Sequence, residues 1–172
     1  MGEERMRRGV RLGVDVGSVR VGVASCDPDG LIATPLETVP RVKDGSDVSR
    51  VAELAAEHHA IEVIVGLPRS LDGAERAAAE GARAWAKALR RHTPALPVRL
   101  VDERMTTVDA HRALDATGVS HRDRRAIIDQ QAAVLILQVA LDSERVSGKL
   151  AGEAVGGRKP RRKPGSDREG RL

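Results

Sequence analysis

The chain of 172 residues is long enough for one α/β domain that buries its own core without disulfides or a structural metal. It contains one tryptophan and no phenylalanine or tyrosine, which argues against modules that bind single strands by stacking bases on aromatic side chains. The formal net charge is +4, and the stretch from Arg158 to Leu172 holds seven basic and two acidic residues, so the rest of the chain is close to neutral.

Short runs rich in valine and isoleucine, bounded by glycine, proline and aspartate, predict five strands. These strands cover residues 10–16, 19–25, 32–39, 61–67 and 98–102. The first three are joined by short turns and should therefore form a meander, whereas each of the last two follows a helical segment.

Apolar residues at helical spacing predict helices between and after these strands. The helices cover residues 46–59, 72–91, 106–118 and 126–145. Ser46 is placed to cap the first of them, and Thr106 with Asp109 forms a capping box for the third. A meander followed by alternating helices and strands predicts an α/β fold, with a five-stranded mixed sheet and helices on both faces.

The C-terminal part of the chain differs in composition from the rest. Apolar residues are scarce beyond Gly148, and glycine, proline and basic residues dominate from Gly156. We therefore expect one folded domain, 1–148, and a disordered basic tail, 149–172. Such a tail can hold phosphate backbones without reading sequence, or it can simply favour solubility.

The sequence also indicates where the protein works. The charged N-terminus is not followed by a signal-peptide core, and the chain has no apolar run long enough to span a membrane. A single cysteine, Cys26, excludes a disulfide within the chain and fits a reducing cytoplasm. We expect a cytoplasmic protein without a membrane partner, in which an exposed Cys26 could still join two chains of a homodimer.

Asp15 is the most informative residue of the chain, because it stands among the apolar residues of a strand that helices should cover. Burying an ionised carboxylate is costly unless a metal, a cation or several donors meet it. Asp15 therefore needs a partner, and Gly17 and Ser18 leave room for one. The alternative is an Asx turn, in which Asp15 ends the strand and accepts hydrogen bonds from the amides of these two residues.

Two further acids can join Asp15. Asp129 shares a helix face with the apolar Ala133, so it should point at the sheet, unless it only favours the positive end of its helix. Asp102 and Glu103 end the fifth strand and point to opposite faces, so only one of them can reach Asp15. Spacing does not choose between them, although the longer side chain slightly favours Glu103.

Three carboxylates from two strands and one helix form a site with oxygen ligands only, which suits Mg²⁺ or Mn²⁺ rather than zinc. Such ions activate water and stabilise the leaving oxygen in phosphodiester cleavage. The common serine-hydrolase, zinc-protease and P-loop motifs do not occur in the sequence. The three acids therefore point to metal-dependent hydrolysis of a phosphodiester.

Four motifs, in order along the chain, resemble the YqgF family, also called RuvX, which has an RNase H-like fold. They are Val14-Asp15-Val16-Gly17 with Arg20-Val21-Gly22-Val23-Ala24, Ile64-Val65-Gly66-Leu67-Pro68 with Asp72-Gly73, Asp102-Glu103-Arg104-Met105-Thr106-Thr107, and Ile128-Asp129 with Ala132-Ala133 and Ile136-Leu137-Gln138. The resemblance spans about residues 10–141. It implies a metal-dependent nuclease whose catalytic acids and metal ligands are Asp15, Glu103 and Asp129, and it thereby chooses Glu103 over Asp102.

The resemblance implies two kinds of nucleic-acid partner, since family members are associated with Holliday junctions and with processing of the 5′ end of pre-16S rRNA. It does not decide between branched DNA and structured RNA. RuvC resolvases carry a second acid one turn further along their last helix, where this chain has Ala132. This departure implies a second metal held loosely, or held only when substrate phosphate supplies a ligand.

Basic residues near the acids should contact substrate phosphates, unless they form surface ion pairs instead. They are Arg20, which follows the Asp15 turn, Arg104, which follows Glu103, and Arg122, Arg124 and Arg125 in a basic loop before the last helix. We expect this loop to become ordered only when substrate binds.

Two other functions fit part of the sequence. ATP-binding domains of the actin and sugar-kinase type also have an Asp-x-Gly strand turn, but they need two domains to close on a nucleotide, and 172 residues barely supply one. A ribosome or DNA interaction module without activity would explain the basic loop and tail equally well. Binding of ATP and metal-dependent cleavage are the measurements that separate these functions from a nuclease.

Overall fold

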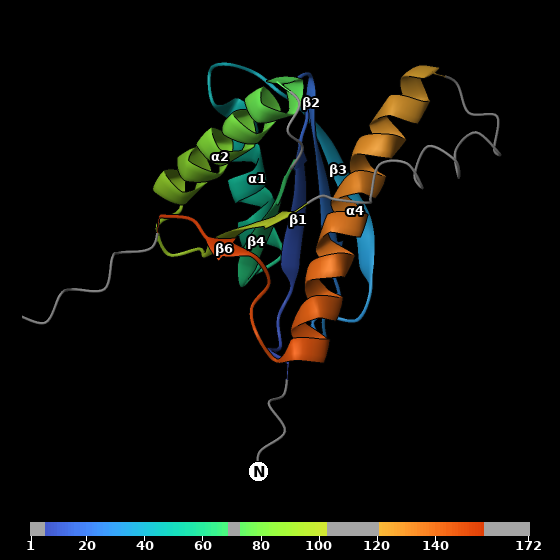
Figure 1. The fold of residues 1–172 in the computed structure, drawn as a ribbon, viewed down its shortest axis with the longest axis vertical. Helices are drawn as coiled ribbons and strands as arrows, with labels where there is room; N and C mark the ends of the chain where they lie inside the picture. Colours follow the sequence, from blue (N-terminus) through green and yellow to red (C-terminus); the bar gives the residue numbers. More distant parts are fainter. Residues whose placement is uncertain (1–5, 69–72, 103–120, 157–172) are drawn as a thin grey trace, which may run out of the picture.

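The computed structural model describes residues 6–68, 73–102 and 121–156. They form a mixed sheet with the strand order β3-β2-β1-β4-β5-β6 (Figure 1). The strands are β1 (Arg11–Val16), β2 (Arg20–Cys26), β3 (Ala33–Pro40), β4 (Glu62–Leu67), β5 (Val98–Asp102) and β6 (Glu153–Ala154). The first three are antiparallel, while β4 and β5 run parallel to β1. The predicted α/β class and the first five strands are confirmed.

The sheet has six strands, so the prediction of five was wrong. The sixth, β6, pairs with the outer edge of β5 and lies within the segment 149–172 that we expected to be a disordered tail. Arg99 of β5 holds this segment by donating hydrogen bonds to the carbonyls of Ala151 at 2.6 Å and Gly152 at 2.7 Å. A strand of two residues has no periodic pattern by which the sequence could indicate it. Residues 157–172 lie outside the described part, and the tail stays a prediction for them.

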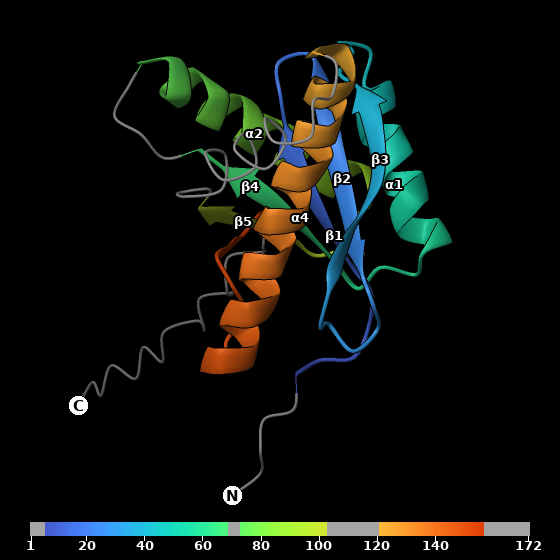
Figure 2. The same cartoon turned by 90° about the vertical axis from the view of Figure 1, so that its right-hand side faces the viewer.

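Helices cover both faces of the sheet, as predicted (Figure 2). On one face α1 (Ser46–Glu57) and α2 (Gly73–His92) enclose a core of aliphatic residues and Trp85. On the other face α4 (His121–Ser147) encloses a second core. The sheet is therefore the middle of three layers.

The first helix begins one residue away from its predicted cap. Gly45 takes the N-cap position of α1 with φ of 83°, so Ser46 is the first helical residue rather than the cap. The Asp44 carboxylate accepts a hydrogen bond from the backbone N–H of Ser46 at 2.9 Å. Glycine occupies this left-handed conformation without the steric cost that a side chain would bring.

The last helix begins earlier than predicted. α4 starts at His121, so Arg122, Arg124 and Arg125 belong to its first turns and not to a loop. Arginine is a good helix former, and in this segment helix propensity outweighs the polar composition that suggested a loop. The helix predicted over 106–118 lies outside the described residues.

Alternate residues of β1 face the two helical layers. Leu12 and Val14 are fully buried in the core under α1 and α2. Gly13, between them, faces α4. A Cβ atom at Gly13 would lie 2.6 Å from the Leu137 Cβ and 2.7 Å from the Ala133 carbonyl oxygen. Glycine at this position is therefore what allows α4 to approach β1 so closely.

A cluster of ion pairs ties the segment before β1 to the C-terminal part of α4. Arg7 donates to Glu144 at 2.9 Å and to Glu62 at 3.2 Å, and Arg11 lies 3.6 Å from Glu144. Arg11, Glu62 and Glu144 are buried. Burial alone would raise the pKa of Glu144, but the hydrogen bond from Arg7 and the charges of both arginines outweigh it and hold that pKa below its ordinary value.

We expect Glu144→Gln to lower the free energy of unfolding by about 2 kcal/mol near neutral pH, because it removes a charge from a buried set of ion pairs. A carboxyl group whose pKa is depressed by folding stabilises the protein above its unfolded pKa, and this contribution disappears as the pH falls through the folded pKa. The difference between wild type and variant should therefore shrink below about pH 4. Urea unfolding at pH 7 and pH 3 measures it, and a difference independent of pH would contradict the expectation.

Within the described part of the chain, none of the helices is long and apolar enough to cross a membrane. Cys26 is buried, its sulfur accepts a hydrogen bond from the backbone N–H of Arg11 at 3.3 Å, and burial raises the pKa of its thiol. An exposed Cys26, the condition for a disulfide between two chains, is therefore not found.

Candidate active site

Asp15 lies near the end of β1 on the sheet face that α4 covers. Side chains of a strand alternate between the two faces, and Gly13, two residues earlier, faces α4. The Asp15 side chain is partly buried. β1 continues through Val16, and the amide of Gly17 donates to the carbonyl of Arg20 at 2.8 Å. The Gly17 amide is therefore not the donor that the alternative Asx turn requires.

Glycines flank Asp15 on both neighbouring strands. Gly22 of β2 pairs directly with Asp15, and the register that pairs Val14 with Val65 brings Gly66 of β4 beside it. Partners in adjacent strands project from the same face of a sheet. At these paired positions, therefore, neither neighbouring strand places a side chain beside the Asp15 carboxylate.

A hydrogen bond between α4 and β3 fixes where this helix crosses the sheet. Gln130 donates through Nε2 to Oγ1 of Thr38 at 2.7 Å. Thr38 pairs with Gly22, which pairs with Asp15, so the three residues form one row across the sheet. The helix therefore passes over the row of Asp15 at residue 130.

The close approach at Gly13 leads to the same register. Ala133 and Leu137 lie against Gly13, and α4 runs antiparallel to β1 because the residues nearer its N-terminus contact later rows of the sheet. Two residues along a strand cover about 7 Å, and four residues along a helix cover about 6 Å. Residue 129 of α4 is consequently level with Asp15, although its side chain is outside what the structure describes.

β5 alternates between the same two cores. Leu100 belongs to the core under α1 and α2, whereas Val101 belongs to the core under α4. Alternation therefore assigns Asp102, the last residue of β5, to the face away from α4. Glu103 and Arg104 lie outside the described residues.

No group of three histidine, cysteine or acidic side chains that could hold a metal is found among the described residues. Of the three predicted acids, only Asp15 has a described side chain. Of the arginines predicted to bind phosphate, Arg20 is the partly buried first residue of β2. Arg122, Arg124 and Arg125 are described only by their backbone, in the first turns of α4. The sequence had not singled out the glycine neighbours of Asp15 or the Gln130 contact, because both depend on strand register.

Comparison with known proteins extends these observations. A family model described as RuvX, Holliday junction resolvase, matches residues 9–143. A curated protein from Streptomyces coelicolor named "Putative pre-16S rRNA nuclease" is 57% identical over 155 residues, covering 88% of this chain and 90% of the relative. A relative of the same name from Mycobacterium leprae is 50% identical over 160 residues, covering 87% of each chain.

A solved structure has the same fold. T. thermophilus RuvC in complex with a Holliday junction substrate matches with a TM-score of 0.53 and 16% identity, covering 80% of this chain and 96% of that chain. The similarity confirms the RNase H-like architecture that the four sequence motifs implied. Because the family model covers most of the folded part and the relatives are named as nucleases, the nuclease prediction is confirmed. The chain belongs to the RuvX family of Holliday junction resolvases and is a nuclease.

Proposed function

We propose that this chain is a metal-dependent endonuclease for structured nucleic acid, with Asp15, Glu103 and Asp129 as its catalytic acids. The observation that carries the proposal is the position of Asp15, partly buried beneath α4 with a glycine beside it on each neighbouring strand. Residue 129 is level with Asp15 on α4. Alternation along β5 assigns Asp102 to the face away from α4, which supports Glu103 over Asp102 as the third acid.

The oxygen ligands of the three acids suit Mg²⁺ or Mn²⁺. When bound, such an ion activates water and stabilises negative charge on the leaving oxygen. In the hydrolysis, the oxygen of water bonds to phosphorus, one phosphorus–oxygen ester bond breaks, and the leaving oxygen gains a proton. Ala132 is buried and adds no carboxylate one turn after Asp129, so a second ion would depend on substrate phosphate for a ligand.

The protein itself contributes the arrangement of the acids. The close packing of α4 at Gly13 sets how near residue 129 comes to β1. Arginines would hold the substrate around this point through its phosphates: Arg20, Arg104, Arg122, Arg124 and Arg125. The last three begin α4, where the partial positive charge of a helix N-terminus also favours phosphate.

We place pre-16S rRNA first among the substrates, because relatives that are 50% identical or more and cover nearly nine-tenths of this chain carry its name. Branched DNA is the second candidate, because the family description names Holliday junctions. The protein would meet either kind of nucleic acid in a reducing cytoplasm, because its single cysteine fits that compartment.

A cleavage assay with both substrates tests the proposed function. We expect the protein to cut a 5′ pre-16S rRNA fragment in Mg²⁺ or Mn²⁺, to stop when EDTA removes the metal, and to resume when Mn²⁺ is returned. A four-way DNA junction and a linear duplex of the same sequence are treated in parallel, and the products are sized on denaturing gels. Cleavage that persists in EDTA would contradict metal dependence, and cleavage of the junction alone would contradict the order of the substrates.

A further inference from the structure

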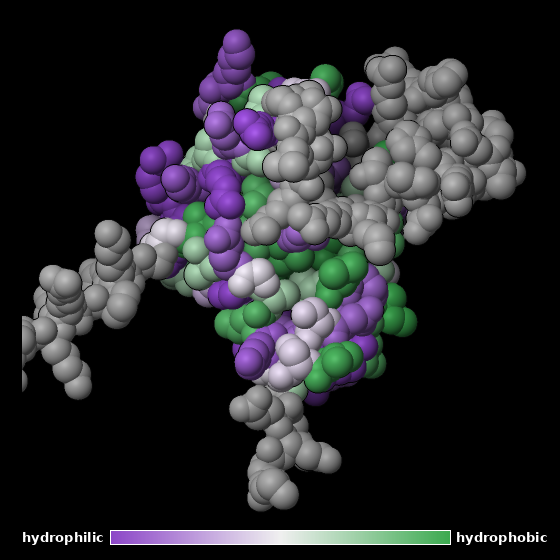
Figure 3. All heavy atoms as spheres, viewed as in Figure 1, coloured by the Kyte–Doolittle hydropathy of each residue, from purple (hydrophilic) through white to green (hydrophobic). Residues whose placement is uncertain are grey.

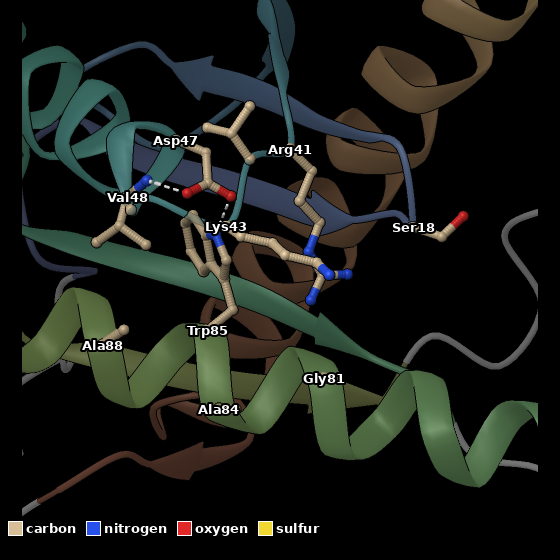
Figure 4. A pocket seen from close by; sticks show the side chains of 11 residues that line it. Ser18, Arg41, Lys43, Asp47, Val48, Gly81, Ala84, Trp85 and Ala88 are labelled. Carbon is tan, nitrogen blue, oxygen red and sulfur yellow. Dashed lines mark hydrogen bonds between the residues drawn. The ribbon is translucent and has the colours of Figure 1, made fainter.

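A pocket lies on the sheet face opposite α4, between α1, α2 and the hairpin that joins β1 to β2 (Figure 4). Its volume is about 430 Å³, within the range of small-ligand sites. Arg41 and Lys43, which follow β3, supply its positive charge, and Ala84 of α2 forms part of the opposite wall. The proposed active site, on the other face, does not use these residues.

Arg41 connects this pocket to the hairpin turn that follows Asp15. Its backbone N–H donates to the carbonyl of Val19 at 2.9 Å, and its Nη1 donates to the carbonyl of Gly17 at 2.9 Å. Its Nη2 reaches α2, since a Cβ atom at Gly81 would lie 3.4 Å from it. The guanidinium is therefore held across the mouth of the pocket, between the turn and α2 (Figure 4).

The two cations have no acidic partner among the described residues. Asp47, the acid that lines the pocket, is 3% exposed, and both its oxygens already accept hydrogen bonds. The donors are the backbone N–H of Val48 at 2.8 Å and Nε1 of Trp85 at 3.2 Å. Asp47 therefore holds Trp85 in place and does not neutralise Arg41 or Lys43. The charge of these two cations is available to an anion.

The exposed side of α2 extends the positive surface away from the pocket. Hydrophilic residues gather on this side of the molecule, with weakly hydrophobic residues between them (Figure 3). Among the exposed described residues of α2, the acid is Glu80 and the basic residues are Arg76, Arg83, Lys87 and Arg91, of which Arg83 pairs with Glu153 at 2.7 Å. A polyanion seated in the pocket would thus continue along a surface of favourable charge.

We propose that the pocket binds one nucleotide of the nucleic-acid strand that leaves the active site over the β1–β2 hairpin, with its phosphate between Arg41 and Lys43. Gly17, whose carbonyl Arg41 holds, is two residues beyond Asp15, which is roughly 7 Å along a strand. A substrate strand that passes this turn therefore meets the two cations next. That the strand is substrate rests on the proposed function, whereas the pocket and its charge do not.

Two substitutions test the pocket without touching the acids. Lys43→Gln removes one cation, and Ala84→Glu brings a negative charge to the exposed wall of α2. Binding of a labelled single-stranded RNA is followed by fluorescence anisotropy in EDTA, where cleavage does not interfere. One lost phosphate contact should reduce the slope of log K against log salt by about 0.7, and weaken binding about fivefold at 0.1 M salt. Ala84→Glu should weaken it further.

Matched variants serve as controls. Ala84→Gln is as large as Ala84→Glu but uncharged, and Lys149→Gln makes the same charge change as Lys43→Gln just beyond the C-terminal end of α4. Both should bind RNA within a factor of about two of wild type. Equal slopes of log K against log salt for Lys43→Gln and Lys149→Gln would show that the pocket does not bind the strand. Metal-dependent cleavage by the wild type would still support the proposed function in that case.

A second ligand distinguishes a strand from a free nucleotide, since both present a phosphate. Calorimetry with a nucleoside monophosphate should give weaker binding than the RNA, because a mononucleotide lacks the contacts of the neighbouring nucleotides. If the monophosphate instead binds more tightly than the RNA and is lost in Ala84→Glu, the pocket is a site for free nucleotides and the strand proposal is wrong. Because these measurements contain no metal, they stay readable even if the three acids prove not to be catalytic.

Discussion

Asp15→Asn should lower metal-dependent cleavage by about a thousandfold or more while leaving the fold intact. An amide has nearly the shape of a carboxylate but cannot neutralise a divalent cation. Gly22 and Gly66 beside Asp15 add no side chains whose packing the change would disturb. Single-turnover cleavage rates at saturating Mg²⁺ measure the effect on chemistry, and urea unfolding in EDTA measures the effect on stability. In EDTA the variant should be at least as stable as wild type, because repulsion among the acids falls.

The matched control is Asp102→Asn. This acid ends β5, one residue before Glu103, but alternation assigns it to the face under α1 and α2. We expect Asp102→Asn to keep most of the cleavage rate, whereas Glu103→Gln and Asp129→Asn behave like Asp15→Asn. Loss of cleavage in Asp102→Asn but not in Glu103→Gln would show that the alternation argument is wrong, and near wild-type cleavage by Asp15→Asn would remove that residue from the site.

The sheet could be predicted from the sequence because local patterns carry it. Five strands are rich in β-branched residues and end at glycine, proline or aspartate, and each lies within about one residue of its predicted bounds. β6 escaped prediction because its two residues are held by Arg99 and by the edge of β5, which are contacts and not a pattern. The start of α4 was missed because charged residues are typical both of loops and of helix ends.

The candidate site could be predicted only in part, for a related reason. Asp15 stands out because an ionised carboxylate is costly to bury among the apolar residues of a strand. Its glycine neighbours are 7 and 51 positions away in the sequence and meet it only through strand register. The bond between Gln130 and Thr38 spans 92 positions. Such contacts follow from how strands and helices are stacked, which composition and spacing do not determine.

The pocket of Arg41 and Lys43 illustrates the same limit. Both residues are in a polar connection, where the sequence predicts only a turn. Their significance comes from α2, which Trp85 and Asp47 hold against α1, and from the hairpin carbonyls that Arg41 reaches. Segments from three separate parts of the chain thus make one site.

Gly13→Ala should have the second large effect, on stability and cleavage together. The added Cβ would lie 2.6 Å from the Leu137 Cβ and 2.7 Å from the Ala133 carbonyl oxygen. These atoms are backbone or the root of a side chain, so no rotamer change relieves the overlap and α4 itself has to move. We expect the free energy of unfolding to fall by about 2–4 kcal/mol, as for other overpacked cores.

Movement of α4 would also carry residue 129 away from Asp15, so the cleavage rate per folded molecule should fall about tenfold or more, since small misplacement of catalytic groups is costly. Ser143→Ala is the control, because Ser143 is exposed near the C-terminal end of α4 and alanine favours a helix. Urea unfolding and single-turnover cleavage, corrected for the folded fraction, measure both effects. If Gly13→Ala cleaves as fast as Ser143→Ala, the distance between α4 and β1 does not set the position of Asp129, and Asp129 would have to act by some other arrangement than the one proposed.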